Sequence, residues 1–210
     1  MGDDKNKRFW GRYARVYDFE VARVNRIAYG QMYQMMGAVL RPDMEVLEVA
    51  TGTGLIACHV AGYVKRVCAT DFSPGMIRAA QKKKGSVSLD NVEFSIEDAT
   101  ALSFGDASFD AAIISNALHI MPNPAAALAN IRRVLKPGGL LIAPTYSHGH
   151  IKDSSWKGYA AFLRLIGFET YTKWTVDEYV SFIAANGFAV DRYQVLKAAF
   201  PLVYLEAHAM

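Results

Sequence analysis

Short apolar runs that alternate with longer helix-like segments constrain the fold of this 210-residue chain more than any other feature. The runs occupy residues 46–50, 67–70, 92–96, 111–115 and 140–144. Strands that alternate with helices form βαβ units, in which successive strands pair in parallel. Because these runs are apolar on both faces, we expect an α/β fold whose parallel sheet is covered by helices on both sides.

The last part of the chain departs from this alternation. Residues 175–185 predict a helix that has Thr175 as its N-cap and ends at Gly187. Two strand-like runs follow, at 189–196 and 202–207. Their connection is too short for a crossover helix, so we expect the sheet to end with one antiparallel strand.

The composition favours a single globular domain over residues 1–210, since 52% of the residues are hydrophobic and 20% are charged. The net charge of +3 is too small for a nucleic-acid scaffold. The longest apolar stretch is too short to span a membrane and the first residues are polar, so we expect a cytoplasmic protein. Cys58 and Cys68 are expected to be reduced core residues, and no metal site is expected.

A glycine-rich segment, 48–54, follows the first strand-like run. Gly52 and Gly54 allow a tight turn and let a ligand approach the main chain at the start of the next helix. The same spacing, with Ala57, also fits the dinucleotide-binding fingerprint, so an NAD-dependent oxidoreductase stays open at this point.

Polar residues then follow successive strand-like runs. Asp71 comes 17 residues after Gly54, where a carboxylate can accept hydrogen bonds from both hydroxyls of a ribose, and we expect it to be reachable by solvent. Asp98 follows the third run and can reach the amino edge of an adenine. Residues 116–119 follow the fourth run, and 136–139 form the turn into the fifth. The carboxyl ends of strands in open α/β sheets are where ligands bind.

The ordered motifs resemble those of class I S-adenosylmethionine-dependent methyltransferases, especially the small-molecule branch that includes the quinone-biosynthesis C-methyltransferases. The motifs are VLEVATGTG, ATDFSP, EDAT, SFDAAIISNALH and RRVLKPGG. The resemblance runs from Tyr13 to the C-terminus. It implies a Rossmann-like, doubly wound sheet of seven strands in the order 3-2-1-4-5-7-6, with strand 7 antiparallel.

The resemblance also implies a cofactor site. Glu48 and the backbone of 50–54 would contact the methionine end, Asp71 the ribose, and Asp98 the adenine edge. The full set of implied cofactor residues is Tyr17, Glu48, Ala50, Thr51, Gly52, Thr53, Gly54, Asp71, Phe72, Met76, Asp98, Ala99, Asn116 and Ala117. Phe72 and Met76 would pack on the adenine face, and Ala99 would lie beside Asp98.

Residues 13–18 resemble the lid segment of this branch, which implies a helical lid over residues 1–43 and a cofactor-binding core over 44–210. Tyr17 would then lie over the reacting methyl group, although a role as a core anchor is the alternative. His119 and His150 follow the fourth and fifth strands, and either could act as a general base or only shape the pocket.

We therefore expect methyl transfer from S-adenosyl-L-methionine to a nitrogen, oxygen, sulfur or carbon atom of a small apolar or aromatic molecule. Three alternatives remain: methylation of a lipid-like acceptor at a membrane surface, an NAD-dependent oxidoreductase, and a non-catalytic binding module with this fold. We expect a small-molecule acceptor, no nucleic-acid partner and no stable membrane insertion. The sequence does not indicate the oligomeric state.

Overall fold

The computed structural model describes residues 18, 25–87, 89–147, 170–198 and 201–210. In these residues the strands are β1 (Glu45–Val49), β2 (Arg66–Asp71), β3 (Val92–Ile96), β4 (Phe109–Ile114), β5 (Leu135–Ile142), β6 (Thr145–Tyr146), β7 (Phe188–Leu196) and β8 (Leu202–Ala209). The α-helices are α2 (Arg26–Val39), α3 (Leu55–Val60), α4 (Pro74–Val87), α5 (Pro124–Val134) and α7 (Val176–Ala185). Two short 3-10 turns, Ala61–Tyr63 and Leu118–Ile120, complete the set.

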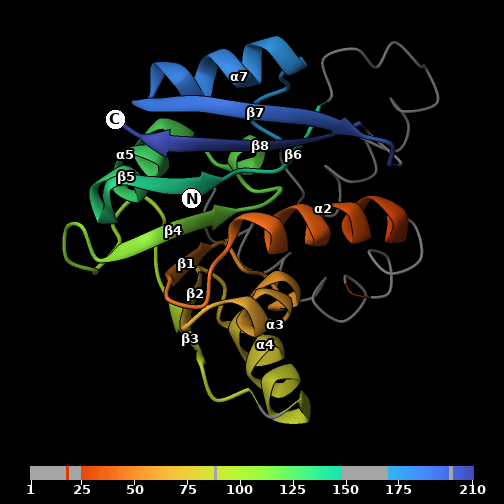
Figure 1. The fold of residues 1–210 in the computed structure, drawn as a ribbon, viewed down its shortest axis with the longest axis vertical. Coiled ribbons are helices and arrows are strands. Elements are labelled where there is room, and N and C mark those ends of the chain that lie inside the picture. Colours follow the sequence, from red (N-terminus) through yellow and green to blue (C-terminus); the bar gives the residue numbers. More distant parts are fainter. Residues whose placement is uncertain (1–17, 19–24, 88, 148–169, 199–200) are drawn as a thin grey trace.

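The strands form one sheet in the order β3-β2-β1-β4-β5-β8-β6, and β7 pairs with β8 (Figure 1). The pairs among β1 to β5 are parallel. β8 runs antiparallel to both β5 and β7. β7 and β8 are the expected sixth and seventh strands, so the predicted order and the antiparallel strand are confirmed. The described residues hold eight strands rather than seven, because β6, a two-residue strand after β5, also pairs with β8.

Helices cover both faces of the sheet, as predicted. Along β1, Val46 packs with α2 and α3, whereas the next residue, Leu47, packs with α5 and α7. This alternation follows from the two-residue period of a strand, which sends successive side chains to opposite faces. Each face is apolar and is buried under its own layer of helices (Figure 1).

The start of β5 differs from the predicted turn. Leu135 already pairs with Phe109, and the next pair is Leu140 with Ala111. The four residues in between, 136–139, form an irregularity inside the strand, and Gly138 has a φ of 70°. The fifth strand therefore begins earlier than the apolar run at 140–144 indicated, because backbone pairing does not require apolar side chains.

The start and end signals of α7 are confirmed. The Thr175 hydroxyl accepts a hydrogen bond from the Glu178 amide at 3.3 Å, and the Glu178 carboxylate accepts one from the Thr175 amide at 2.8 Å. Gly187 follows the helix with a φ of 87°, a conformation that favours glycine. Of the two helices expected before the first strand, α2 is described. The other part of the predicted lid lies outside the described residues, apart from Asp18.

Candidate active site

The strand order reverses between β1 and β4, and the predicted cofactor residues that the structure describes lie at the carboxyl ends of β1 to β4. Open α/β sheets bind ligands at such a reversal. A cavity of about 310 Å³ lies there, within the size range of ligand pockets. Its walls include five of the predicted residues, namely Ala50, Phe72, Asp98, Ala99 and Ala117.

A smaller cavity of about 60 Å³ shares the walls Ala50, Phe72 and Ala117 with the larger one. Four further predicted residues line it: Gly52, Asp71, Met76 and Asn116. The two cavities therefore adjoin, and we call them together the groove; Asp98 lines only the larger cavity and Gly52 only the smaller one. Met76 lines only the smaller part, so its contact with an adenine face stays a prediction.

The glycine turn is a backbone structure that few side chains tolerate. Gly52 and Gly54 have φ values of 59° and 75°. A Cβ atom on Gly54 would lie 2.8 Å from the Phe94 ring, so no larger residue fits there without movement. Ala50 also has a positive φ, 57°, which is unusual for a residue with a side chain. The turn brings main-chain atoms, rather than side chains, to the groove.

Asp71 ties the end of β2 to the glycine turn. Its carboxylate accepts hydrogen bonds from the Gly52 amide at 2.9 Å and from the Ser73 amide at 2.8 Å. A carboxylate offers about four lone pairs, so it can still accept hydrogen bonds from two hydroxyls. Asp71 is more buried than its position at a strand end suggested, since it lines the smaller cavity but only 5% of the residue is exposed. This burial raises the pKa of Asp71 to about 6, despite the two amide donors.

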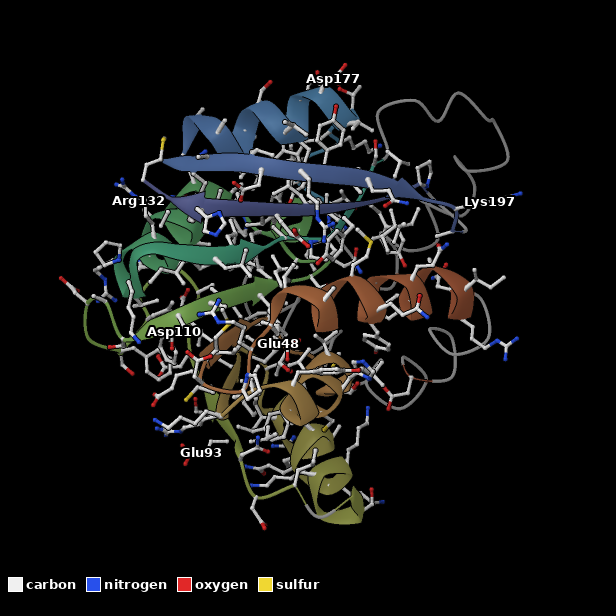
Figure 2. All side chains as sticks on the ribbon, in the orientation of Figure 1. Glu48, Glu93, Asp110, Arg132, Asp177 and Lys197 are labelled. Atoms are coloured by element: carbon white, nitrogen blue, oxygen red, sulfur yellow. The ribbon has the colours of Figure 1, made fainter. Side chains whose placement is uncertain are left out.

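Glu48 lies behind the turn rather than in the groove wall. It is 2% exposed, and its Oε2 accepts a hydrogen bond from the Thr51 hydroxyl at 2.6 Å. Burial raises the pKa of Glu48 to about 8, and the nearby Asp71 carboxylate adds to the increase. Figure 2 shows Glu48 inside the molecule, whereas Glu93 and Asp177 lie at its edge. Glu48 therefore supports the glycine turn from behind through Thr51.

Asp98 lies at the exposed end of the groove. Its Oδ1 accepts hydrogen bonds from the amide and the hydroxyl of Thr100, at 2.8 and 2.7 Å. These contacts fix the carboxylate at the rim of the larger cavity, next to Ala99. The role of Asp98 in binding one edge of an adenine ring stays a prediction.

Asn116 and His119 follow β4. Asn116 has a φ of 53°, and its side-chain amide donates to the Tyr29 hydroxyl at 3.2 Å. His119 is 5% exposed, and its Nδ1 lies 3.1 Å from the Thr145 hydroxyl on β6. Among the described residues the groove wall is formed by the neighbours of His119, Ala117 and Ile120, rather than by His119 itself.

Two of the predicted catalytic residues, Tyr17 and His150, lie outside the described residues, so their roles stay predictions. Within the described ranges, no group of three or more His, Cys, Asp or Glu side chains could hold a metal ion. Cys58 and Cys68 are free thiols, as expected, but only Cys68 is buried in the core, whereas Cys58 is half-buried.

The sequence interpretation missed one wall of the larger cavity, residues 120–123. These residues connect the 3-10 turn after β4 to the start of α5. The sequence pattern that could have identified this wall is the pair Asn123-Pro124, which is typical of the start of a helix. Asn123 caps α5, since its side chain accepts a hydrogen bond from the Ala126 amide at 3.1 Å. A cap at that place fixes where the loop returns over the carboxyl ends of the strands.

Comparison with known proteins agrees with this geometry. Residues 47–143 match the family model described as a methyltransferase domain. The demethylmenaquinone methyltransferase of Renibacterium salmoninarum is 42% identical over 113 residues, which make up 54% of this chain and 45% of that protein. That of Clavibacter sepedonicus is 31% identical over 156 residues, 74% of this chain and 59% of that protein. The chain thus spans about half the length of these curated relatives.

A solved structure supports the same assignment. An S-adenosylmethionine-dependent methyltransferase of Methanosarcina mazei is 25% identical, with a TM-score of 0.68 over 84% of this chain and 97% of that one. The sequence motifs, the domain match and the sheet order point to one family. Residues 47–143 therefore match a methyltransferase domain, and the chain resembles class I S-adenosylmethionine-dependent methyltransferases, among them the quinone-biosynthesis C-methyltransferases.

Proposed function

We propose that this chain transfers a methyl group from S-adenosyl-L-methionine to a small aromatic acceptor. The observation that carries this proposal is the pair of adjoining cavities, of which the larger is lined by Asp98 and the smaller by Asp71 and Gly52. This order of a rim carboxylate, a buried carboxylate and exposed main chain fits an adenine, a ribose and an amino-acid end in succession.

The described residues fit that cofactor. Asp98 and Ala99 would hold the adenine edge, and Asp71 would bind the ribose with the lone pairs that its two amide donors leave. Residues 50–54 would receive the methionine end. When bound, S-adenosylmethionine supplies a methyl group that is attached to a positively charged sulfur. As the methyl group moves to the acceptor, the sulfur keeps the electrons of the broken bond and becomes a neutral thioether. The protein then has to align the acceptor and keep water out, and such positioning contributes about 7–11 kcal/mol in favourable cases.

We further propose that the acceptor is a quinol-type ring and that a ring carbon is methylated. The curated relatives named above are demethylmenaquinone methyltransferases, and this supports a related acceptor here. A phenolic hydroxyl that loses its proton donates electron density to the ring carbon, so a base beside the ring favours attack from carbon.

His119 is our candidate for that base. Its Nδ1 lies 3.1 Å from the Thr145 hydroxyl, a contact that holds the imidazole ring in one orientation behind the groove residues Ala117 and Ile120. Thr145 would thus orient the ring of His119 for the removal of a proton from the acceptor. Tyr17, as a lid residue, and His150, as a second base, belong to the same proposal.

Label transfer tests the proposed function. We expect a methyl group from labelled S-adenosylmethionine to appear on demethylated quinols, with the product identified by mass spectrometry. His119→Asn should lower turnover by about 10²–10⁴-fold, a typical range for the loss of a general base, and leave S-adenosylhomocysteine binding within twofold. Thr145→Val should shift the pH profile of turnover without abolishing it.

The same experiments separate the alternatives. Label in phospholipids of added vesicles would favour a lipid-like acceptor at a membrane surface. NAD binding tighter than S-adenosylhomocysteine binding would favour an oxidoreductase. Binding of S-adenosylhomocysteine without turnover on any quinol, phenol or lipid would favour a non-catalytic module. Among the helices that the structure describes, none combines the length and the apolar character that a membrane crossing needs. Cytoplasmic localisation and the absence of a nucleic-acid partner stay predictions.

A further inference from the structure

Three side chains from distant parts of the chain meet at the back of the glycine turn. The Thr53 hydroxyl donates a hydrogen bond to Asp18, 35 residues earlier in the sequence. The other oxygen of the Asp18 carboxylate lies 2.6 Å from the Lys83 ammonium group on α4. Lys83 also donates to the Thr53 hydroxyl, at 3.3 Å. We call this closed set of contacts the Asp18 triangle.

Thr53 is the member of the triangle that belongs to the cofactor turn. It lies between Gly52 and Gly54, both at positive φ, so the backbone on either side has unusually wide conformational freedom. Thr53 is 1% exposed, and among the described residues its hydroxyl donates only to Asp18. A buried hydroxyl that lacks a partner is costly, so the turn is held in the conformation that keeps this contact.

The charges of the triangle are partly shielded from water. The Lys83 side chain is 22% exposed and that of Asp18 is 39% exposed. The Lys83 ammonium group also counteracts the rise in the pKa of Glu48, so it lies near the buried carboxylate that supports the turn from the other side. Removing the charge of Asp18 or Lys83 should therefore affect the conformation of the glycine turn directly.

We propose that Asp18 and Lys83 are positioning residues for the cofactor, and that they act through Thr53 to fix the glycine turn against the methionine end. Among the described residues, neither side chain lines the groove, so neither is proposed to touch the cofactor. The inference rests on the proposed function, because it assigns the turn to the amino-acid end of S-adenosylmethionine.

Two ligands separate positioning from a general effect on the fold. S-adenosylhomocysteine carries the amino-acid end, whereas 5′-methylthioadenosine has the same adenine and ribose without it. We expect Asp18→Asn and Lys83→Met to weaken S-adenosylhomocysteine binding about fivefold or more, within the range of coupled neighbouring side chains. Methylthioadenosine binding should change less than twofold. Because the two residues act as one unit, the double variant should bind S-adenosylhomocysteine about as tightly as the single variant that has the lower affinity.

Glu93→Gln is the matched control. It removes an ion pair of the same length, Arg66 with Glu93 at 2.6 Å, which joins β2 and β3 away from the turn. Both ligands should bind this variant within twofold of wild type. Calorimetry gives the affinities, and thermal unfolding without ligand reports the stability of each variant.

Several outcomes would overturn the inference. Unchanged S-adenosylhomocysteine binding in folded Asp18→Asn and Lys83→Met proteins would do so, as would equal weakening of both ligands. If Asp18→Asn does not fold, Thr53→Ser and Thr53→Val decide: serine keeps the hydroxyl and should keep the affinity, whereas valine should lose about fivefold. Equal affinities of these two variants would reject the role of Thr53. If the wild-type protein binds neither ligand, the proposed function itself is contradicted. If the wild-type protein binds both ligands but the variants weaken neither or weaken both equally, only this inference is contradicted.

Discussion

Replacing Glu48 with glutamine should stabilise the ligand-free protein at alkaline pH relative to wild type, with a smaller effect at acidic pH. Glu48 is 2% exposed, and burial is the main cause that raises its pKa from 4.5 to about 8. An acid whose pKa is raised by folding favours the folded state while it is protonated. Its contribution is fully present below pH 4.5 and is lost as the pH rises through 8.

The size of the effect follows from the same two pKa values. At about 1.4 kcal/mol for each tenfold change in acidity, the ionised form of Glu48 costs the fold about 5 kcal/mol above pH 8. Glutamine has nearly the same shape, carries no charge, and its carbonyl can still accept from the Thr51 hydroxyl. The difference in the free energy of unfolding between Glu48→Gln and wild type should therefore change by about 3 kcal/mol between about pH 5.5 and about pH 8.5.

Urea unfolding at several pH values in this range measures that difference. Glu45→Gln is the control, since it changes the same residue type at the other end of β1. The hydrogen bond and charge of Lys65 lower the pKa of Glu45, so its titration lies below this range and its effect on stability should be constant across it. A Glu48→Gln effect that does not vary with pH, or that turns destabilising as the pH rises, would refute the reasoning.

Three shorter predictions concern the groove and the fold. Asp71→Ala should weaken S-adenosylhomocysteine binding roughly a hundredfold, since hydrogen bonds to a charged group contribute about 1.5–3 kcal/mol each, and a change under about threefold by calorimetry would reject the ribose role. Gly54→Ala should lower the free energy of unfolding by about 1–3 kcal/mol in urea because of its positive φ and the close Phe94 ring, whereas Gly62→Ala, which has open space, should have a much smaller effect. Thr175→Ala removes the cap of α7 and should lower stability by about 1 kcal/mol in the same assay, and an unchanged midpoint would contradict the value given to the cap.

Much of the fold and of the cofactor site follows from local sequence. The apolar runs, their spacing and the short connection before β8 predict the parallel sheet with one antiparallel strand. Gly52, Gly54, Asp71 and Asp98 could be identified because each lies at the end of a strand or within a few residues after it, and the carboxyl ends of parallel strands meet at one edge of the sheet. The start of α7 could be read from Thr175 because a helix cap depends on neighbours three residues away.

Other features depend on contacts between distant segments, which no local pattern encodes. Asp71 has the sequence position of an exposed strand end, but the residues packed around it leave 5% exposed and raise its pKa. The pairing of His119 with Thr145 and the meeting of Asp18 with Thr53 and Lys83 likewise require the finished packing of the chain. The sequence by itself determined which chemical groups stand at the strand ends. Only the tertiary structure decided their burial, their charge state and their partners, because desolvation and ion pairing depend on everything that surrounds a group in space.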